Sequence, residues 1–133
     1  MLEVYEFLKE CGVFFIATEE KDQPRVRPFG VVNLFEDKLY LQTGKKKNVS
    51  KQIQENPKIE ICGLNKDKQD TWIRIEAEAV RDDRKEAKKD MLDNNPYLRQ
   101  MYSEDDDNTE VLYLKNVTAR ICSFTEPEKV IKF

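Results

Sequence analysis

The segment TGKKKNVSK, residues 43–51, holds four lysines in nine residues and no acidic side chain. It stands where an extended run gives way to a helix predicted over 49–55, with Asn48 as its cap. A helix N-terminus exposes unpaired N–H groups and the positive end of the helix dipole, so nearby lysines are unfavourable unless an anion lies among them. The pattern therefore indicates a phosphate site. A solvated basic loop is the alternative.

A second candidate for anion binding is QPRVRPFG, residues 23–30. At strand spacing Arg25 and Arg27 share one face, and Val26 lies on the other. Adjacent guanidiniums repel each other unless solvent or an anion separates them, and arginine forms forked hydrogen bonds to phosphate. The alternative is a solvent-facing strand. Trp72, the sole tryptophan, is expected in the core, at a subunit interface or over a planar ligand.

The composition limits the chemistry that the chain's own side chains can perform. Histidine is absent, which excludes Ser-His and Cys-His catalysis and removes the commonest metal ligand. Cys11, Cys62 and Cys122 lie far apart without a C-x-x-C pair, so neither a disulfide framework nor a zinc site is expected. If the protein is an enzyme, a bound cofactor would carry the chemistry. The net charge of −3 argues against nucleic acid as a partner.

The length and hydropathy fit one globular domain, which we place over 1–133. Apolar residues make up 39% of the chain and charged residues 37%. No apolar run approaches the ~20 residues that cross a bilayer, and the first residues lack the basic start and apolar centre of a signal peptide. We therefore expect a cytoplasmic protein with no membrane partner.

The elements that would position these residues are short helices among many strands. Helical periodicity predicts helices over 2–11, 49–55 and 84–95, the last continuing helically through PYLRQMY. Apolar runs and alternation predict six strands, over 13–18, 24–35, 38–43, 58–64, 71–82 and 109–124. We expect an interruption of the second strand near Pro28 and Gly30, and the last strand is either one or two joined at Lys115–Asn116. Most turns are too short for parallel crossovers, so we predict a mainly β protein whose antiparallel sheet curls into a barrel or sandwich.

The order GVFFIAT, QPRVRPFG, KLYLQTGKKKNVSKQIQENPKIEI and WIRIEAEA resembles the pyridoxamine 5′-phosphate oxidase-like superfamily of flavin-binding split barrels. The resemblance runs from the first helix to about Val80. It is greatest for small single-domain members of the nitroimidazole-resistance and general-stress types. It implies a six-stranded antiparallel split β-barrel with flanking helices that binds FMN, in a homodimer with the flavin sites at the interface.

The resemblance also implies which residues hold the cofactor. The strand from Arg25 to Gly30 would lie along the flavin, with Arg25 reaching the phosphate. The strand end and the helix start would hold the phosphate and ribityl chain, and Trp72 would approach from the second subunit. The predicted cofactor-binding residues are Arg25, Val26, Arg27, Pro28, Gln42, Thr43, Lys46, Lys47, Asn48, Lys51 and Trp72.

The chain departs from the family pattern at three places. The full oxidases carry Arg and Trp in a C-terminal substrate-binding segment, which the ending SFTEPEKVIKF lacks, so vitamin B6 oxidation is not expected. Nitroimidazole-resistance proteins often carry a histidine near the flavin, and this chain has no histidine. Where the oxidases have Arg-Lys at the helix start, this chain has Asn48-Val49. The deazaflavin F420 and haem are alternative cofactors, and the absence of histidine disfavours haem ligation.

These observations favour an FMN-dependent oxidoreductase that acts on a small organic substrate or electron acceptor. No catalytic residue is assigned. Tyr40, Tyr97 and Tyr102 are candidate proton donors that no motif supports. The alternative hypothesis is a non-catalytic flavin-binding module, such as a redox or stress sensor or an electron carrier. A nucleic-acid-binding barrel would use the same lysines, but the acidic EDDD stretch and the overall charge disfavour it.

Overall fold

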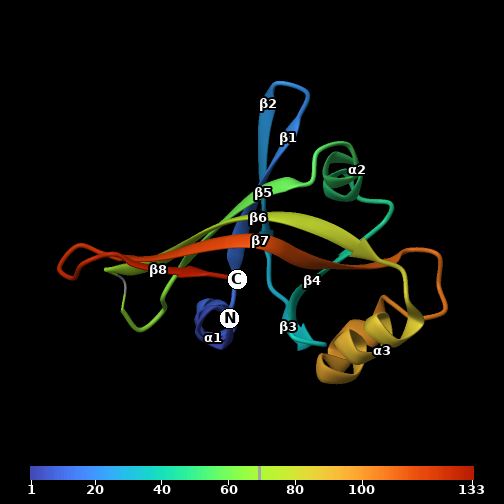
Figure 1. The fold of residues 1–133 in the computed structure, drawn as a ribbon. Helices are drawn as coiled ribbons and strands as arrows, with labels where there is room; N and C mark the ends of the chain where they lie inside the picture. The colour runs from blue at the N-terminus through green and yellow to red at the C-terminus, as the bar shows by residue number, and fades with distance from the viewer. Residues whose placement is uncertain (69) are drawn as a thin grey trace.

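The computed structural model describes residues 1–68 and 70–133, which form one antiparallel sheet with helices packed against it (Figure 1). The strands are β1 (Phe14–Glu20), β2 (Gln23–Phe29), β3 (Val32–Phe35), β4 (Lys38–Gly44), β5 (Lys58–Leu64), β6 (Thr71–Asp82), β7 (Thr109–Ser123) and β8 (Lys129–Lys132). The helices are α1 (Leu2–Cys11), α2 (Asn48–Glu55), α3 (Lys85–Asn94) and the 3₁₀ helix η1 (Pro96–Gln100). None of these helices is long and apolar enough to span a bilayer.

The sheet order makes the fold an open barrel. The strands follow the order β2-β1-β5-β6-β7-β4-β3, and β8 pairs with β7. The strands β2 and β3 lie at opposite ends of this path, yet only residues 30–31 separate them in the chain. The sheet must therefore curl until its two ends are adjacent. Since no ladder joins these ends within the described residues, the barrel is split there.

The predicted elements agree with the structure over most of the chain. The predicted strands 58–64 and 71–82 match β5 and β6 residue for residue, and the helix 2–11 matches α1. The sheet has eight strands rather than six, because the predicted strand 24–35 divides at residues 30–31 and the tail adds β8. Pro28 lies within β2, which tolerates it because β2 is at an edge of the sheet.

Two apolar clusters stabilise the fold. The larger one fills the barrel and includes fully buried side chains from most of the central strands: Phe14, Ile16, Leu41, Ile61, Ile73, Ile75 and Leu112. The smaller one lies between α3 and the strands β4 and β7, and it includes Tyr40, Met91, Leu92 and Val111. The β4 strand contributes to both clusters, so its position is fixed on both faces.

The long strand β7 contains a bulge opposite the middle of β6. Glu76 pairs with Thr118, but Glu78 pairs with Lys115, so β7 carries one extra residue between these pairs. Asn116 has a φ of 53°, a left-handed conformation that occurs in one class of β-bulge. The predicted junction at Lys115–Asn116 is therefore a bulge within one strand.

An ionic network with a buried carboxylate, Asp82, holds β4 against the end of β6. The Tyr40 hydroxyl donates to Asp82 Oδ2 over 2.7 Å, and Arg84 donates from Nε to Oδ1 over 3.0 Å and from Nη2 to Oδ2 over 2.9 Å. The Arg84 hydrogen bonds, aided by Tyr40, lower the pKa of the Asp82 carboxyl to about 2. Glu36, in the β3–β4 turn, pairs with the same guanidinium at 2.9 Å.

Candidate functional site

The N-terminus of α2 opens without a side-chain cap. The cap position is Lys47, not Asn48 as predicted, because Lys47 has extended backbone angles (φ −79°, ψ 151°) while Asn48 is already helical. The N–H of Ser50 donates to the Lys47 carbonyl over 3.2 Å, but within the described residues no side chain accepts from the N–H groups of Asn48 and Val49. These donors and the positive end of the helix dipole are therefore available to an anion.

The loop before α2 is held by Asn108, which immediately precedes β7. The backbone N–H of Lys45 donates to the Asn108 carbonyl over 2.7 Å, and that of Lys46 donates to Asn108 Oδ1 over 3.0 Å. The side chain of Lys45 pairs with Asp83 at 3.0 Å. The loop conformation is therefore fixed by contacts outside its own segment, which a sequence motif does not show.

Arg27 is a half-buried guanidinium that pairs with no carboxylate within the described residues. It donates to Thr18 Oγ1 over 2.8 Å and to the Ile16 carbonyl over 3.1 Å, and it donates to Gln52 Oε1 on α2 over 2.6 Å. All three acceptors are neutral. Burial and the neighbouring Arg25 lower the pKa of Arg27 from its ordinary value. The lowered pKa means that the charged form of Arg27 is destabilised where it lies. An anion beside it would offset that destabilisation.

Arg25, which the resemblance assigns to the phosphate, already has a partner. Its Nε and Nη2 donate to Glu20 Oε1 at 3.2 and 2.9 Å, and its side chain is half exposed. Both arginines lie on the face of β2 that is turned to α2, as the alternation predicts. The structure thus places Arg27, rather than Arg25, as the uncompensated charge nearest the helix.

Two adjoining clefts lie beside these groups. The polar cleft, of about 490 Å³, is lined by Glu20, Arg25, Val26, Arg27, Lys47, Asn48, Val49 and Gln52. The mixed cleft, of about 200 Å³, is lined by Arg27, Pro28, Phe29, Gly30, Val31, Gln42, Thr43, Lys47, Val49, Leu98, Met101 and Tyr102. They share Arg27, Lys47 and Val49. They therefore adjoin, and the polar cleft provides a cationic end while the mixed cleft provides a largely apolar end.

Gln42 provides a buried acceptor at the apolar end. Its Nε2 donates to the Thr43 carbonyl over 3.0 Å, but its Oε1 is buried and has no hydrogen-bond partner among the described residues. An unpaired buried acceptor costs about 1–3 kcal/mol. A ligand that brings an N–H or O–H into the mixed cleft would satisfy it. A flavin phosphate ester has both the anion and such donors, so the residues present fit this group.

The structure brings most of the predicted site residues together. Eight line the two clefts: Arg25, Val26, Arg27, Pro28, Gln42, Thr43, Lys47 and Asn48. The exposed side chains of Lys46 and Lys51 do not line either cleft. Trp72 lies near the other end of the sheet, because it pairs with Leu64, six residues along β5 or about 20 Å from Lys58. Its predicted role requires a second chain.

Sequence reasoning missed the wall of the mixed cleft and the polar groups behind Arg27. Leu98 and Met101 come from η1 and the residue after it, far along the chain. Tyr102, which the sequence offered only as a candidate proton donor, follows them in the same wall. Gln52 lies on the buried face of α2, where the QIQEN pattern gave no signal for a contact with Thr18 or Arg27. Long-range contacts of this kind depend on how the sheet curls.

The structure distinguishes the three candidate tyrosines. Tyr40 is buried and donates to Asp82, and burial together with this hydrogen bond raises its pKa far above the ordinary value. Tyr97 is exposed and lines neither cleft. Tyr102 lines the mixed cleft. Of the three, Tyr102 is therefore the phenol that a ligand in the site would meet.

The fold and the site define a split β-barrel with a cleft that can receive an anionic, partly apolar ligand. The chain belongs to the pyridoxamine 5′-phosphate oxidase family, because the sequence model of that family matches residues 2–122. No curated protein matches the chain.

Solved structures of similar proteins agree with this assignment. A NimC/NimA family protein from Clostridium acetobutylicum is 47% identical over 100% of this chain and 92% of that one, with a TM-score of 0.96. General Stress Protein 26 from Bacillus anthracis is 14% identical over 99% and 97% of the two chains, with a TM-score of 0.77. A protein from Mesorhizobium loti described as FAD-binding is 14% identical over 92% and 94%, with a TM-score of 0.64. The last two show the shared fold.

Proposed function

We propose that the protein binds FMN in the joined clefts and acts as a small cytoplasmic flavin-dependent oxidoreductase. The observation that carries this proposal is the guanidinium of Arg27, which has no carboxylate partner in the described residues and lies beside the uncapped N-terminus of α2. The phosphate would lie between Arg27, Lys47 and the first N–H groups of α2. The ribityl chain and ring would extend into the mixed cleft, toward Gln42.

The flavin, when bound, would supply hydride or electron transfer to a small organic acceptor. The chain's own part is to neutralise the phosphate, orient the ring and exclude water. Leu98 and Met101 provide apolar surface beside the ring, and Tyr102 holds a hydroxyl proton at the same wall. A second copy of the chain, carrying Trp72, would complete the site, as the family resemblance implies.

Titration of the purified protein with FMN, followed by absorbance and flavin fluorescence, tests the binding proposal. Replacing one charged donor to a phosphate costs about 1.5 kcal/mol or more, so Lys47→Ala should raise the dissociation constant about tenfold. Arg27→Gln should raise it further. Lys132→Ala, which removes an equal charge from an exposed site in β8, is the matched control. Absence of flavin binding by the unmodified protein would refute the proposal.

Turnover separates an oxidoreductase from a non-catalytic flavin module. We expect the FMN-loaded protein to be reduced by NAD(P)H and to pass electrons to a nitro compound or a quinone. Tyr102→Phe should leave FMN affinity unchanged and lower turnover if its hydroxyl supplies a proton. Reduction without turnover across a broad acceptor panel would favour the non-catalytic module.

A further inference from the structure

Arg27 differs from every other arginine of the chain in the acceptors that it meets. Six of the seven arginines pair with a carboxylate: Arg25, Arg74, Arg81, Arg84, Arg99 and Arg120. Within the described part of the chain, Arg27 donates only to neutral oxygens, which are the Gln52 amide on α2 and the oxygens of Thr18 and Ile16 on β1. The fold therefore gives the other guanidiniums a counter-charge and gives this one an amide.

Gln52 occupies a position on α2 where an apolar side chain would pack. It is 4% exposed and lies on the same buried face of the helix as Val49 and Ile53. Burying an amide is unfavourable unless it is hydrogen-bonded. Here the Gln52 Oε1 accepts from Arg27 and from the Thr18 hydroxyl, each over 2.6 Å. The amide thus holds the Arg27 guanidinium in place without adding a charge.

Arg81 reaches the same helix with a carboxylate beside it. Its Nη2 donates to Ser50 Oγ over 3.2 Å, and its Nε pairs with Glu110, whose side chain is fully buried. A guanidinium away from water is ordinarily compensated in this way, because an unpaired buried charge is strongly destabilising. A glutamate at position 52 would fill nearly the same space as the glutamine and would pair with Arg27. The glutamine therefore leaves available a charge that a glutamate would neutralise.

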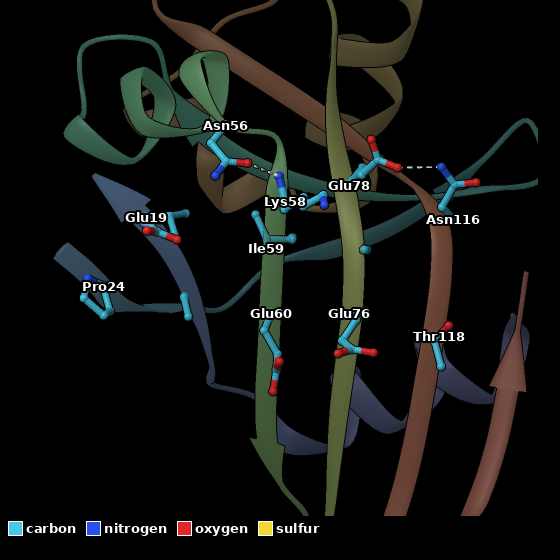
Figure 2. A pocket seen from close by; sticks show the side chains of 13 residues that line it. Glu19, Pro24, Asn56, Lys58, Ile59, Glu60, Glu76, Glu78, Asn116 and Thr118 are labelled. Atoms are coloured by element: carbon cyan, nitrogen blue, oxygen red, sulfur yellow. Dashed lines mark hydrogen bonds between the residues drawn. The ribbon is translucent and has the colours of Figure 1, made fainter. Parts of the chain in front are cut away.

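The charge of the polar cleft beside Gln52 is opposite to that of a phosphate monoester. Three cations, Arg25, Arg27 and Lys47, line the cleft with one carboxylate, Glu20, so these side chains carry a net charge of +2. A phosphate monoester carries about −1.5 to −2 near neutral pH. The hollow over β5 and β6 in Figure 2 is of similar size, about 540 Å³, but four glutamates and one lysine line it. Of the two, only the polar cleft would attract a phosphate, and a glutamate at position 52 would halve its charge.

We propose that Gln52 is a positioning residue that makes the site select a phosphorylated ligand over the same ligand without its phosphate. It orients the Arg27 guanidinium by a hydrogen bond and leaves the positive charge for the anion. The inference rests on the proposed function for the identity of the ligand, FMN. It goes further by assigning the preference for FMN over riboflavin to one neutral side chain that need not touch the phosphate itself.

Two substitutions of Gln52 separate the effect of charge from that of hydrogen bonding. Fluorescence titrations at neutral pH give the dissociation constants of FMN and riboflavin for each variant. Gln52→Glu keeps the acceptor but neutralises Arg27, so it should raise the dissociation constant of FMN about tenfold and that of riboflavin at most about twofold. Gln52→Ala removes the acceptor without adding a charge and should weaken FMN binding less, about threefold.

Gln54→Glu is the matched control, because it makes the same chemical change on the exposed face of the same helix. It should alter both dissociation constants by less than about twofold.

Melting temperatures show whether the new carboxylate acts through Arg27. In the unmodified background, Gln52→Glu should shift the melting temperature by at most about 3 °C, since the carboxylate has the guanidinium as its partner. In the Arg27→Gln background the same substitution should lower it by about 5 °C or more, because the buried carboxylate is then unpaired.

The outcomes separate the possible failures. Equal losses of FMN and riboflavin affinity in Gln52→Glu, or a larger loss of FMN affinity in Gln52→Ala than in Gln52→Glu, would overturn the inference, because Gln52 would then only support the fold. An equal shift of the melting temperature with and without Arg27 would overturn it as well.

Failure of the unmodified protein to bind FMN would refute the proposed function. The inference would then stand if inorganic phosphate raised the melting temperature of the unmodified protein more than that of Gln52→Glu, and it would fall if phosphate affected both alike.

Discussion

Replacing Asp82 by asparagine tests the ionic network that holds β4, the strand that carries Gln42 and Thr43. The Asp82 side chain is 7% exposed and accepts from Tyr40 and Arg84. Its pKa falls from the ordinary 3.8 to about 2. At roughly 1.4 kcal/mol for each tenfold change in proton affinity, the ionised carboxylate stabilises the fold by about 2 kcal/mol at neutral pH.

The sign of the pH dependence follows from the direction of this change. A carboxyl with a lowered pKa in the folded state stabilises the protein above its unfolded pKa, and this stabilisation is lost as the pH falls through the folded pKa. The contribution of Asp82 should therefore be complete at pH 7, about half by pH 3 and absent below pH 2. Asp82→Asn lacks a charge to titrate, so its deficit relative to the unmodified protein should shrink over the same range.

Urea unfolding at a series of pH values between about 7 and 3 measures the deficit. The free energies of unfolding of the two proteins should differ by at least about 2 kcal/mol at pH 7, and the gap should narrow by about 1 kcal/mol at pH 3. Asp22→Asn, at an exposed turn position, is the control and should show neither effect. A gap for Asp82→Asn that is constant with pH would refute the assignment of a lowered pKa to this carboxyl.

Three further outcomes are expected. Gly63→Ala should lower the melting temperature, since the new Cβ would lie 2.8 Å from Cys11 Sγ, and adding Cys11→Ala should recover part of the loss. Asn108→Ala should weaken FMN binding about fivefold, because it removes the hydrogen bond from the Lys46 N–H that orders the loop before α2. Such a hydrogen bond contributes about 1 kcal/mol. Thiol labelling of the folded protein should spare Cys11, whose burial raises its pKa to about 11. Cys62, which is exposed, should react faster than Cys11.

Each of these outcomes has a clear contrary result. An unchanged melting temperature for Gly63→Ala would mean that α1 shifts freely away from β5. Asn108→Ala binding FMN as tightly as the unmodified protein would show that the loop keeps its conformation without this residue. Labelling of Cys11 in the folded protein as fast as that of Cys62 would contradict the burial of the Cys11 thiol.

The helices and long strands could be predicted because the spacing of apolar residues along the chain shows which side chains are buried. The alternation of β6, TWIRIEAEAVRD, places its isoleucines and alanines inward, and the predicted bounds were those observed. The tail gave no such signal, because β8 pairs with β7 along one edge and buries little of its own surface. Its strand character comes from backbone hydrogen bonds to a neighbour rather than from its own sequence pattern.

The site could be predicted as a region but not as a set of contacts. Lysines at a helix start and arginines on one face of a strand indicated an anion, and the structure brings β2 and α2 together. Which arginine is uncompensated depends on whether the side chain of Arg25 reaches Glu20, two residues along β1 from its strand partner Thr18. The hydrogen bonds of the loop depend on Asn108. These partners follow from register and from the curl of the sheet, which local residue types do not determine.

The extra residue at Asn116 reverses the alternation of β7. Before it, Leu112 and Leu114 face the barrel interior, whereas after it Val117 and Ala119 do so. Deleting the exposed Asn116 would remove the bulge and leave Leu114, Val117 and Ala119 on one face of a regular strand, so the same side chains would stay inside. A deletion of Asn116 should therefore be tolerated far better than a one-residue deletion within the regular part of β6, which would turn every following side chain to the other face of the sheet.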